Sequence, residues 1–470
     1  MATIIEQKPL YTQTPVGQDV IFVVSNSNIV STKTRVKFQA EVHISNTFSP
    51  NTAVADDVVG KFKTTPNNAG VGIFNLRSVI ENYVSADNMA RIGSSYKGET
   101  TTDDKRHPLH LIDKYSGNVN LMRYLVIQFK TEYFDTTTNQ LVQVEAVNSS
   151  LFQIFNGYLT YADVLDVSGS NFGFDMSDDF LLTSTKDKFL TNAPIIQYAN
   201  VEDYGTVAMF TPKAFNDQLS DISYIRLTYK DSSGSSLGSE NISRNTLNGA
   251  YDNFNAYIGM NIMYFGCFPG NLQNWSPTFK ALVTAGTIQG GEIGVEVYSS
   301  TPAQIASAYT IKVNCPDLKG YESIRLCWLN QYGVWDYYTF TKKSTKSITT
   351  QGSTYNQLEG SWNESRYRLD SFKGGKKTFR VNSTERISMN TDYITESESI
   401  WLEELINSPE VYILKGQTGQ TDGTGSALNQ YVTPVRLTTT SYTRKTVAND
   451  KLIQYTFEVE KTKTLRTQAI

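Results

Sequence analysis

RVKFQAEVHI, residues 35–44, alternates polar and apolar side chains along its whole length. Because successive side chains of a β-strand point to opposite faces, this pattern predicts a strand with one face on a core and the other in water or on a partner. Turn-forming runs such as KDSSGSSLG (230–238) separate one such stretch from the next. The alternation recurs at residues 124–130, 224–230, 291–297 and 452–460.

Helices are expected at only two places. The apolar residues of FNLRSVIENYV (74–84) are spaced as a helical stripe. TESESIWLEELINSP (395–409) opens with the capping-box pair Thr395 and Glu398 and stops at Ser408-Pro409. Because these helices do not alternate with strands, a doubly wound α/β sheet is disfavoured. The predicted fold class is mainly β, with two or three β-sandwich-like domains and a few short helices.

The composition is typical of a folded, β-rich protein. The chain has 470 residues, enough for about three domains. Aromatic residues make up 12% of it and charged residues 19%, whereas disordered chains are poor in aromatic residues. The formal net charge of −4 comes from 42 basic and 46 acidic residues, so no global attraction to nucleic acid or to an acidic membrane is expected.

Two polar, aperiodic stretches suggest domain boundaries, VSGSNFGFDMSDD (167–179) and CPDLKG (315–320). A third stretch of low complexity, residues 416–430, predicts an exposed loop. The predicted domains are an N-terminal β-sandwich-like domain with one helix (1–166), a middle β-rich domain (180–316) and a C-terminal β-sandwich-like domain with a capping helix at 395–407.

The chain shows no targeting or membrane segment. MATIIEQKPLYTQTP at the start lacks the charged and apolar regions of a secretory signal, and no stretch reaches the roughly eighteen apolar residues of a membrane span. Cys267, Cys315 and Cys327 have no metal-ligand spacing and are expected to be reduced thiols. An adhesin-like composition without an export signal favours a virion protein, which leaves the cell by lysis.

Residues 321–340, YESIRLCWLNQYGVWDYYTF, contain seven aromatic residues. The pattern predicts a β-hairpin that reverses at Asn330–Gly333. Such rings could form a sugar-stacking platform, a sandwich core or a partner surface; on a hairpin, one set would fill a core and the other would meet a partner. The candidate interface residues are Trp328, Tyr332, Trp335, Tyr337, Tyr338 and Trp401, with Trp401 anchoring its helix to the last sandwich.

Candidate chemistry is sparse. DDKRHPLH (103–110) places His107 and His110 three residues apart, but a metal site needs three or four converging ligands, and a polar loop explains the stretch better. The carboxylate pairs at 56–57, 178–179 and 403–404 are typical of solvated surfaces. No phosphate-binding or hydrolase motif is present in the sequence. We therefore predict no catalytic, cofactor-binding or metal-binding residues and no enzymatic activity.

Basic residues cluster at 342–346, 373–377 and 461–466. Each cluster by itself is typical of a solvated face, and the last could also serve as an assembly arm. Binding of nucleic acid would require such residues on one surface together with stacking aromatic rings.

Five segments carry a resemblance to a known family. They are PLYTQTPVGQDVIFVVSNSNIV (9–30), TTPNNAGVGIFNLRSVIENYV (64–84), HPLHLIDKYS (107–116), CWLNQYGVWDYYTF (327–340) and ISMNTDYITESESIWLEELINSPEVYI (387–413). Their order resembles that of structural proteins of tailed phages of Bacteroidetes hosts, among them the virion tail proteins of crAss-like podoviruses. The likeness covers most of the chain and is weakest over 180–310.

This resemblance implies a subunit of an oligomeric ring in the tail or connector below the portal, where β-rich rings form the tail barrel. The expected partners are identical subunits, with a dodecamer among the candidate symmetries, and other tail, portal or ring proteins. DNA is expected only in transit, and no membrane and no cofactor are expected. The expected location is the virion tail, after synthesis in the host cytoplasm. The alternatives are a carbohydrate-binding, receptor-binding protein of the tail and a tail depolymerase.

Overall fold

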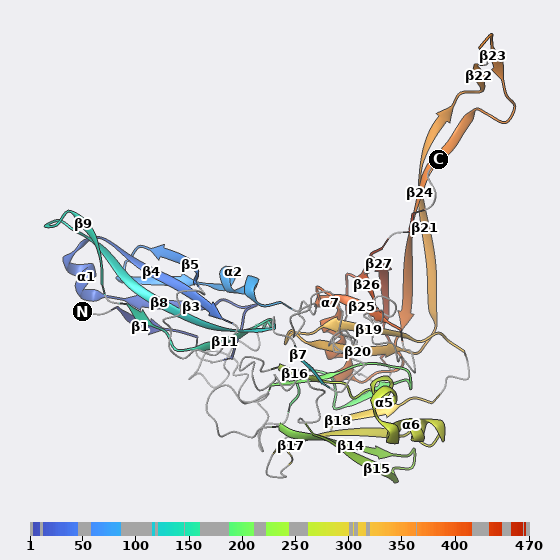
Figure 1. Ribbon diagram of the computed structural model, residues 1–470, viewed down its shortest axis with the longest axis horizontal. Helices are drawn as coiled ribbons and strands as arrows, with labels where there is room; N and C mark the ends of the chain where they lie inside the picture. The colour runs from blue at the N-terminus through green and yellow to red at the C-terminus, as the bar shows by residue number, and fades with distance from the viewer. Residues whose placement is uncertain are drawn as a thin grey trace. The chain divides into compact units, whose positions relative to one another are not determined.

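The computed structural model describes residues 3–9, 13–45, 58–85, 115–117, 121–144, 146–159, 188–210, 222–243, 262–299, 304, 309–315, 320–362, 364–415, 432–443, 453–463 and 465–466. In this part the chain is mainly β with several sheets and a few short helices, as predicted. It divides into two compact units, whose helices and strands are labelled in Figure 1. The first holds the described residues up to 315 and Leu329–Tyr337, and the second holds those of 317–328, Tyr338–Lys415 and 431–470.

Two sheets that share one core open the first unit. The smaller has the order β1 (Ile4–Gln7), β3 (Ile21–Ser25), β6 (Val71–Asn75). The larger has the order β2 (Gln13–Pro15), β11 (Phe152–Phe155), β8 (Met122–Asp135), β4 (Thr34–Ser45), β5 (Val58–Thr64), and β9 (Gln140–Gln143) and β10 (Val147–Asn148) also pair with β8. Phe22 of the smaller sheet lies 5.6 Å from Phe129 of the larger, ring centre to ring centre, so the two sheets form a sandwich-like pair.

Strand β4 confirms the alternation predicted for residues 35–44. Phe38, Ala40 and Val42 are fully buried in the shared core. The opposite face is covered as well, since Glu41 is also buried and its Oε2 atom lies 3.1 Å from the Lys61 ammonium. Helix α1 (Ser27–Thr32) precedes this strand and begins at Asn26, whose side chain accepts a hydrogen bond from the backbone N–H of Ile29.

The helix predicted at 74–84 is shorter than expected. Strand β6 continues to Asn75, and only α2 (Arg77–Ile80) and the 3-10 turn η2 (Glu81–Tyr83) follow. Phe74 pairs with Phe22 across the smaller sheet, and its ring is buried in the shared core. Cross-strand pairing therefore overrides the helical spacing at the start of this segment.

A second pair of sheets completes the first unit. One has the order β12 (Ile196–Ala199), β18 (Tyr309–Val313), β17 (Glu292–Ser299), β14 (Ile222–Lys230), β15 (Ser236–Ser243), and the other β13 (Val207–Phe210), β16 (Ile262–Phe265), β7 (Tyr115–Gly117). Helices α5 (Pro269–Trp275) and α6 (Pro277–Thr284) pack on their common core. Strand β7 comes from the predicted first domain and pairs with β16 of the predicted middle domain.

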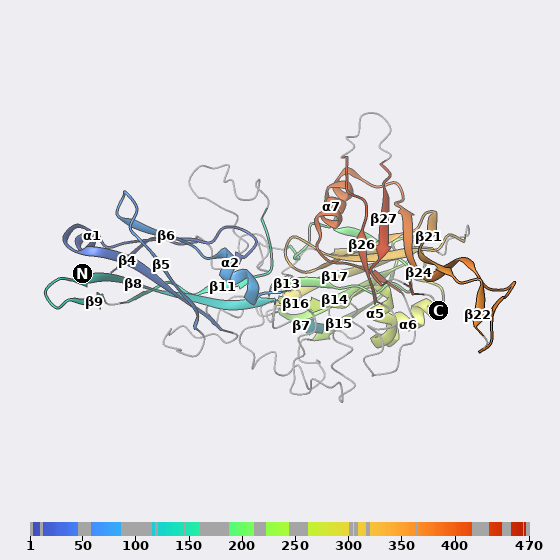
Figure 2. The same ribbon diagram turned by 90° about the horizontal axis from the view of Figure 1, so that it is seen from above.

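The last sheet has the order β20 (Trp335–Phe340), β19 (Ile324–Leu329), β25 (Val411–Leu414), β26 (Val432–Leu437), β27 (Thr456–Lys461), β24 (Gly375–Asn390), β21 (Ser344–Gln357), and β28 (Leu465–Arg466) also pairs with β24. Two short strands, β22 (Gly360–Trp362) and β23 (Tyr367–Leu369), connect β21 to β24. Figures 1 and 2 both show β22 at the far end of β21 and β24, away from β26 and β27 of the same unit.

Helix α7 (Glu396–Asn407) confirms the predicted capping helix. The Thr395 hydroxyl accepts a hydrogen bond from the backbone N–H of Glu398, and the Glu398 carboxylate accepts one from the backbone N–H of Thr395. The helix lies beside β26 in both views of the molecule (Figures 1 and 2). Its Trp401 ring packs 5.1 Å from the Trp328 ring of β19, which confirms that Trp401 anchors the helix to this sheet.

The predicted division into three domains stays a prediction. The described chain forms two units, and the second begins at the boundary expected near residue 317. Within the first unit, one core draws on residues 16–154 and another on 189–313. The boundary between the first two predicted domains, the linker at 167–179 and the loop at 416–430 lie outside the described residues.

Candidate functional site: a projecting β-hairpin

The aromatic hairpin predicted as an interface is part of the core. Trp328, Tyr332, Trp335, Tyr337 and Trp401 are between 0% and 3% exposed, and Tyr338 is half-buried. The expectation that one ring set faces outward is therefore corrected, because the chain itself covers both sets. A ring with no exposed surface cannot contact another subunit without unfolding its surroundings.

The turn of this hairpin forms where it was predicted. Asn330 donates its backbone N–H to Val334 at 2.8 Å, and its side chain accepts from the backbone N–H of Tyr332. Gly333 has a φ of 73°, and a Cβ at this position would lie 1.7 Å from the carbonyl oxygen of Asn156. Only glycine fits here, both for its backbone conformation and for the close approach of a neighbouring chain segment.

The hairpin rings have partners within each unit. In the first unit, the Tyr332 hydroxyl donates to Asn192 Oδ1 at 2.8 Å, and the Tyr337 hydroxyl lies 3.1 Å from that of Thr206. In the second unit, the Tyr338 ring packs 6.0 Å from Trp401. Burial raises the pKa of the Tyr338 hydroxyl, and the charges of Glu398 and Asp392 raise it further. These contacts account for the aromatic rings of 328–340 as core packing, whereas Tyr321 is 42% exposed.

Exposed apolar side chains gather elsewhere, on the hairpin formed by β21, β22, β23 and β24. We call residues 344–390 the arm. None of the described residues in 344–386 is buried. Seven of the seventeen exposed large apolar residues in the described chain belong to it: Ile348 64%, Leu358 76%, Trp362 66%, Tyr367 48%, Leu369 75%, Phe372 75% and Phe379 49%.

The arm extends well past the sheet that holds its base. Strand β24 pairs with β27 only from Arg386 to Asn390, whereas β21 and β24 stay paired up to Gln357 and Gly375. The strands thus continue beyond Arg386 for about ten residues, or roughly 35 Å at about 3.3 Å per residue. In this outer part the only further pairing in the described chain is that of β28 with Asn382 and Ser383.

The tip of the arm is ordered by its own hydrogen bonds. Trp362 and Tyr367 are direct partners across the β22–β23 pair. Asp370 accepts from the Ser361 hydroxyl at 2.8 Å and from the Lys373 ammonium at 3.3 Å. The Ser361 hydrogen bond lowers the pKa of Asp370, burial opposes this by raising the pKa, and Lys373 lowers it further. The tip therefore presents its apolar side chains from a defined turn.

The arm is basic, unlike the rest of the chain. Residues 344–390 contain eight Lys or Arg and four Asp or Glu, a net charge of +4, so the remainder of the chain carries −4 − 4 = −8. The outer part is the most basic, with six Lys or Arg against one Asp in 366–380. The predicted basic clusters 342–346 and 373–377 lie at the base and at the outer end of the arm, and the cluster 461–466 lies along β27 and β28 beside it.

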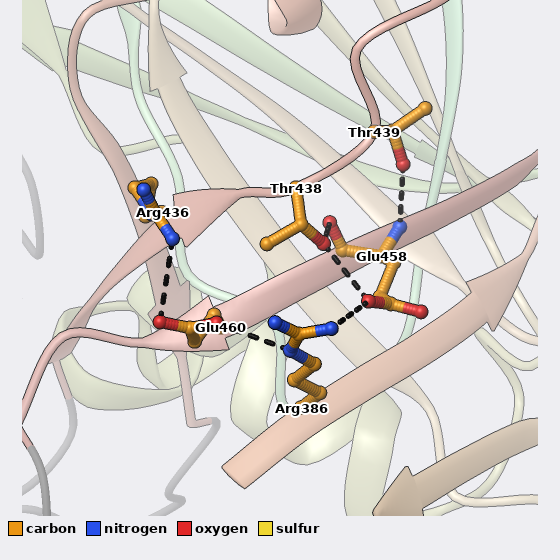
Figure 3. Close-up of polar contacts among 6 residues, drawn as sticks. All are labelled: Arg386, Arg436, Thr438, Thr439, Glu458 and Glu460. Atoms are coloured by element: carbon orange, nitrogen blue, oxygen red, sulfur yellow. Dashed lines mark hydrogen bonds and ion pairs between the residues drawn. The ribbon is translucent and has the colours of Figure 1, made fainter. Parts of the chain in front are cut away.

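A charged network holds the arm where it leaves the sheet (Figure 3). Arg386 Nε lies 3.1 Å from Glu460, and Arg436 of β26 lies 3.4 Å from the same carboxylate. Arg386 also lies 3.7 Å from Glu458, which accepts from the Thr438 hydroxyl at 3.0 Å. The network spans β26, β27 and β24, so it fixes the base of β24 to the sheet.

The other stretches weighed as candidate sites lie mostly outside the described residues. No group of three or more His, Cys, Asp or Glu is placed to hold a metal ion within the described ranges. The stretch 103–110 and the carboxylate pairs at 56–57 and 178–179 lie outside them. Glu403 and Glu404 lie on α7, where Glu404 is buried. Cys267 and Cys327 are buried and Cys315 is exposed, and none of the three belongs to a disulfide among the described residues.

None of the described helices has the length and apolar character needed to cross a bilayer.

Comparisons with known proteins do not identify a family. No protein-family model matches the chain. No curated protein matches it either. Among solved structures, the native conformation of alpha-2-macroglobulin from E. coli is similar over 82% of this chain, at 9% identity and a TM-score of 0.17. The chain spans only 22% of that protein, and a similarity of this size carries no argument about fold or function.

Sequence reasoning missed the arm. Its strand β21, STKSITTQGSTYNQ, has no apolar face, so it lacks the alternation by which the other strands were recognised. One available signal was a run of β-branched and polar residues on each side of a turn-rich, basic segment. A second was the tryptophan in GSWNES (360–365), which has only small and polar neighbours.

Proposed function

We propose that this chain is a structural subunit of a bacteriophage virion that assembles with identical copies into a ring of the tail or connector below the portal. The observation that carries the proposal is the arm, a long hairpin without a buried residue in 344–386 of the described chain. The segment order of residues 9–30, 64–84, 107–116, 327–340 and 387–413 supplies the virion context by resemblance.

The arm favours a subunit that assembles with others, because a projecting β-hairpin is too weakly stable by itself. A two-stranded hairpin alone is marginally stable at best in water and needs a third layer or strand. Leu358, Trp362 and Phe372 are at least 66% exposed, and burying such side chains fully is worth roughly 1.5–3 kcal/mol each. Several large apolar side chains exposed on one short element favour an interaction site.

The alternative of a carbohydrate-binding protein of the tail draws on one observation. Trp362 and Tyr367 are exposed rings that lie opposite each other, and exposed rings can stack on sugars. A glycan array with the intact protein tests this alternative, since specific binding that is lost in Trp362→Ala would support it over the ring subunit.

Electron microscopy of the purified protein, together with mass spectrometry of purified phage particles, tests the proposal. We expect closed rings of one chain and peptides of this chain in the virion. A protein that stays monomeric at all accessible concentrations and is absent from particles would overturn it.

A further inference from the structure

We propose that the arm of each subunit docks on the body of a neighbouring copy of the same chain, with the apolar tip buried there and the open edge of β21 paired with a strand of that neighbour. This inference rests on the proposed oligomeric role and adds to it the element that makes the contact. Three independent observations support it: the edge strand, the apolar tip and the distribution of charge.

Strand β21 is an open edge. It is the last strand of its sheet and pairs only with β24 in the described chain. Proteins protect long edges with prolines, lysines, bulges or a covering element. β21 has fourteen residues, no proline and one lysine near its base, and the register of its pairing with β24 shifts once, with the extra residue on β24 between Thr378 and Arg380. From Ser347 to Ser353 the edge has none of these protections, and such an edge is suited to strand addition.

The tip supplies an apolar anchor at the end of this edge. Leu369 and Trp362 belong to the two short strands of the tip, and Phe372 follows the second of them. Each is at least 66% exposed. Aromatic anchors that enter a pocket carry most of the binding energy in protein interfaces. The aliphatic members, Leu358 and Leu369, favour a protein surface over nucleic acid, whose contacts are stacking and charge.

The distribution of charge selects the partner. A basic arm of net charge +4 is complementary to the rest of its own chain, which carries −8. Two arms would repel each other, with six Lys or Arg against one Asp in each outer part, so a two-fold arm-to-arm contact is disfavoured. An arm-to-body contact joins two different surfaces, and contacts of this kind close into rings when the rotation permits.

Trypsin digestion can report directly whether the arm is docked on a neighbouring copy. Its outer part holds many trypsin sites, at Arg366, Arg368, Lys373, Lys376, Lys377 and Arg380. Since no described residue of 344–386 is buried within the chain, the free subunit should be cut here first. Docking on a neighbour should protect these sites.

The test compares two triple variants of the full chain. The tip variant is Trp362→Ser, Leu369→Ser and Phe372→Ser. The control variant is Leu141→Ser, Tyr393→Ser and Ile400→Ser, three exposed apolar residues away from the arm at 62%, 58% and 49% exposure. Neither variant alters a buried residue, so circular dichroism and the melting temperature should stay at the wild-type values.

We expect the tip variant to weaken subunit association on the order of 1,000-fold in sedimentation velocity or mass photometry, and to leave the arm sensitive to trypsin. The control variant should assemble with an unchanged, trypsin-resistant arm. Because the arm and the body carry opposite charge, assembly of the wild type should also weaken as salt is raised.

The outcomes separate this inference from the proposed function. A wild-type protein that is monomeric refutes the proposed function. Rings that persist in the tip variant, or rings whose arms remain trypsin-sensitive, refute the docking of the arm. They do not affect the proposal that the chain is a ring subunit. Assembly that nuclease abolishes, or a trypsin-protected arm only in the presence of anionic lipid vesicles, assigns the arm to nucleic acid or membrane and refutes docking on a second copy.

Discussion

The comparison of Trp328 with Trp362 gives the sharpest test of where this chain uses its aromatic residues. Trp328 is 0% exposed and packs against Trp401, whereas Trp362 is 66% exposed at the tip of the arm. We expect Trp328→Ala to cost about 3–5 kcal/mol of unfolding free energy, since it removes a large buried ring and leaves a cavity. Trp362→Ala should change that free energy by less than about 0.5 kcal/mol.

Thermal unfolding followed by circular dichroism, on dilute and therefore monomeric protein, measures the difference. For a unit of this size, about 1 kcal/mol corresponds to roughly 3–4 °C, so Tm should fall by about 10–20 °C for Trp328→Ala and by less than about 2 °C for Trp362→Ala. Urea unfolding should rank the variants in the same order.

In assembly assays the order of the two variants should be reversed, with Trp362→Ala the more damaging substitution for folded protein. Trp362→Ala should weaken association of the folded protein, whereas Trp328→Ala should impair assembly only to the extent that it unfolds the second unit. Equal destabilisation of the monomer by both variants would refute the assignment of Trp362 to an exposed tip and of Trp328 to the core.

Three further predictions concern single features of the fold. Thr395→Ala should lower the unfolding free energy by about 1 kcal/mol in urea titrations, because it removes the capping box of α7; Thr395→Asp should retain most of the stability. Gly333→Ala should lower Tm and reduce the yield of folded protein, since a Cβ would lie 1.7 Å from the Asn156 carbonyl oxygen. A wild-type Tm would contradict that geometry. The Lys63 hydrogen bond at 2.6 Å lowers the pKa of Glu132 below 4.5, so the stability from this carboxylate is complete above the unfolded-state pKa and is lost as the pH falls through the folded-state pKa. Urea midpoints of Glu132→Gln should therefore lie below wild type at pH 7 and converge with it as the pH falls through the folded-state pKa, and a constant offset would refute the linkage.

Local physical chemistry explains the elements that could be predicted from the sequence. The alternation at 35–44 predicted β4, and the pair Thr395 and Glu398 predicted the start of α7. The turn at Asn330–Gly333 also follows from its own residues, since Asn330 accepts backbone hydrogen bonds and Gly333 adopts a positive φ. Each of these features depends on neighbours within a few positions of the chain.

The candidate site could not be predicted in the same way. Alternation says that the two faces of a strand differ, and it does not say what covers each face. The rings of the aromatic hairpin are in contact with Asn192, Thr206 and Trp401, which lie more than sixty positions away in the sequence. We therefore predicted an interface with another subunit at rings that other parts of the same chain already bury.

The sequence by itself determined that this protein is built of sheets with a capped helix, because period, capping and turn chemistry are local properties of the chain. The tertiary structure alone decided which aromatic residues are buried and which are exposed. It buries Trp328 beneath α7 and leaves Trp362 at the outer end of β21 and β24, where no described residue of 344–386 is buried. Burial depends on contacts between distant segments, and no local pattern around either tryptophan records those contacts.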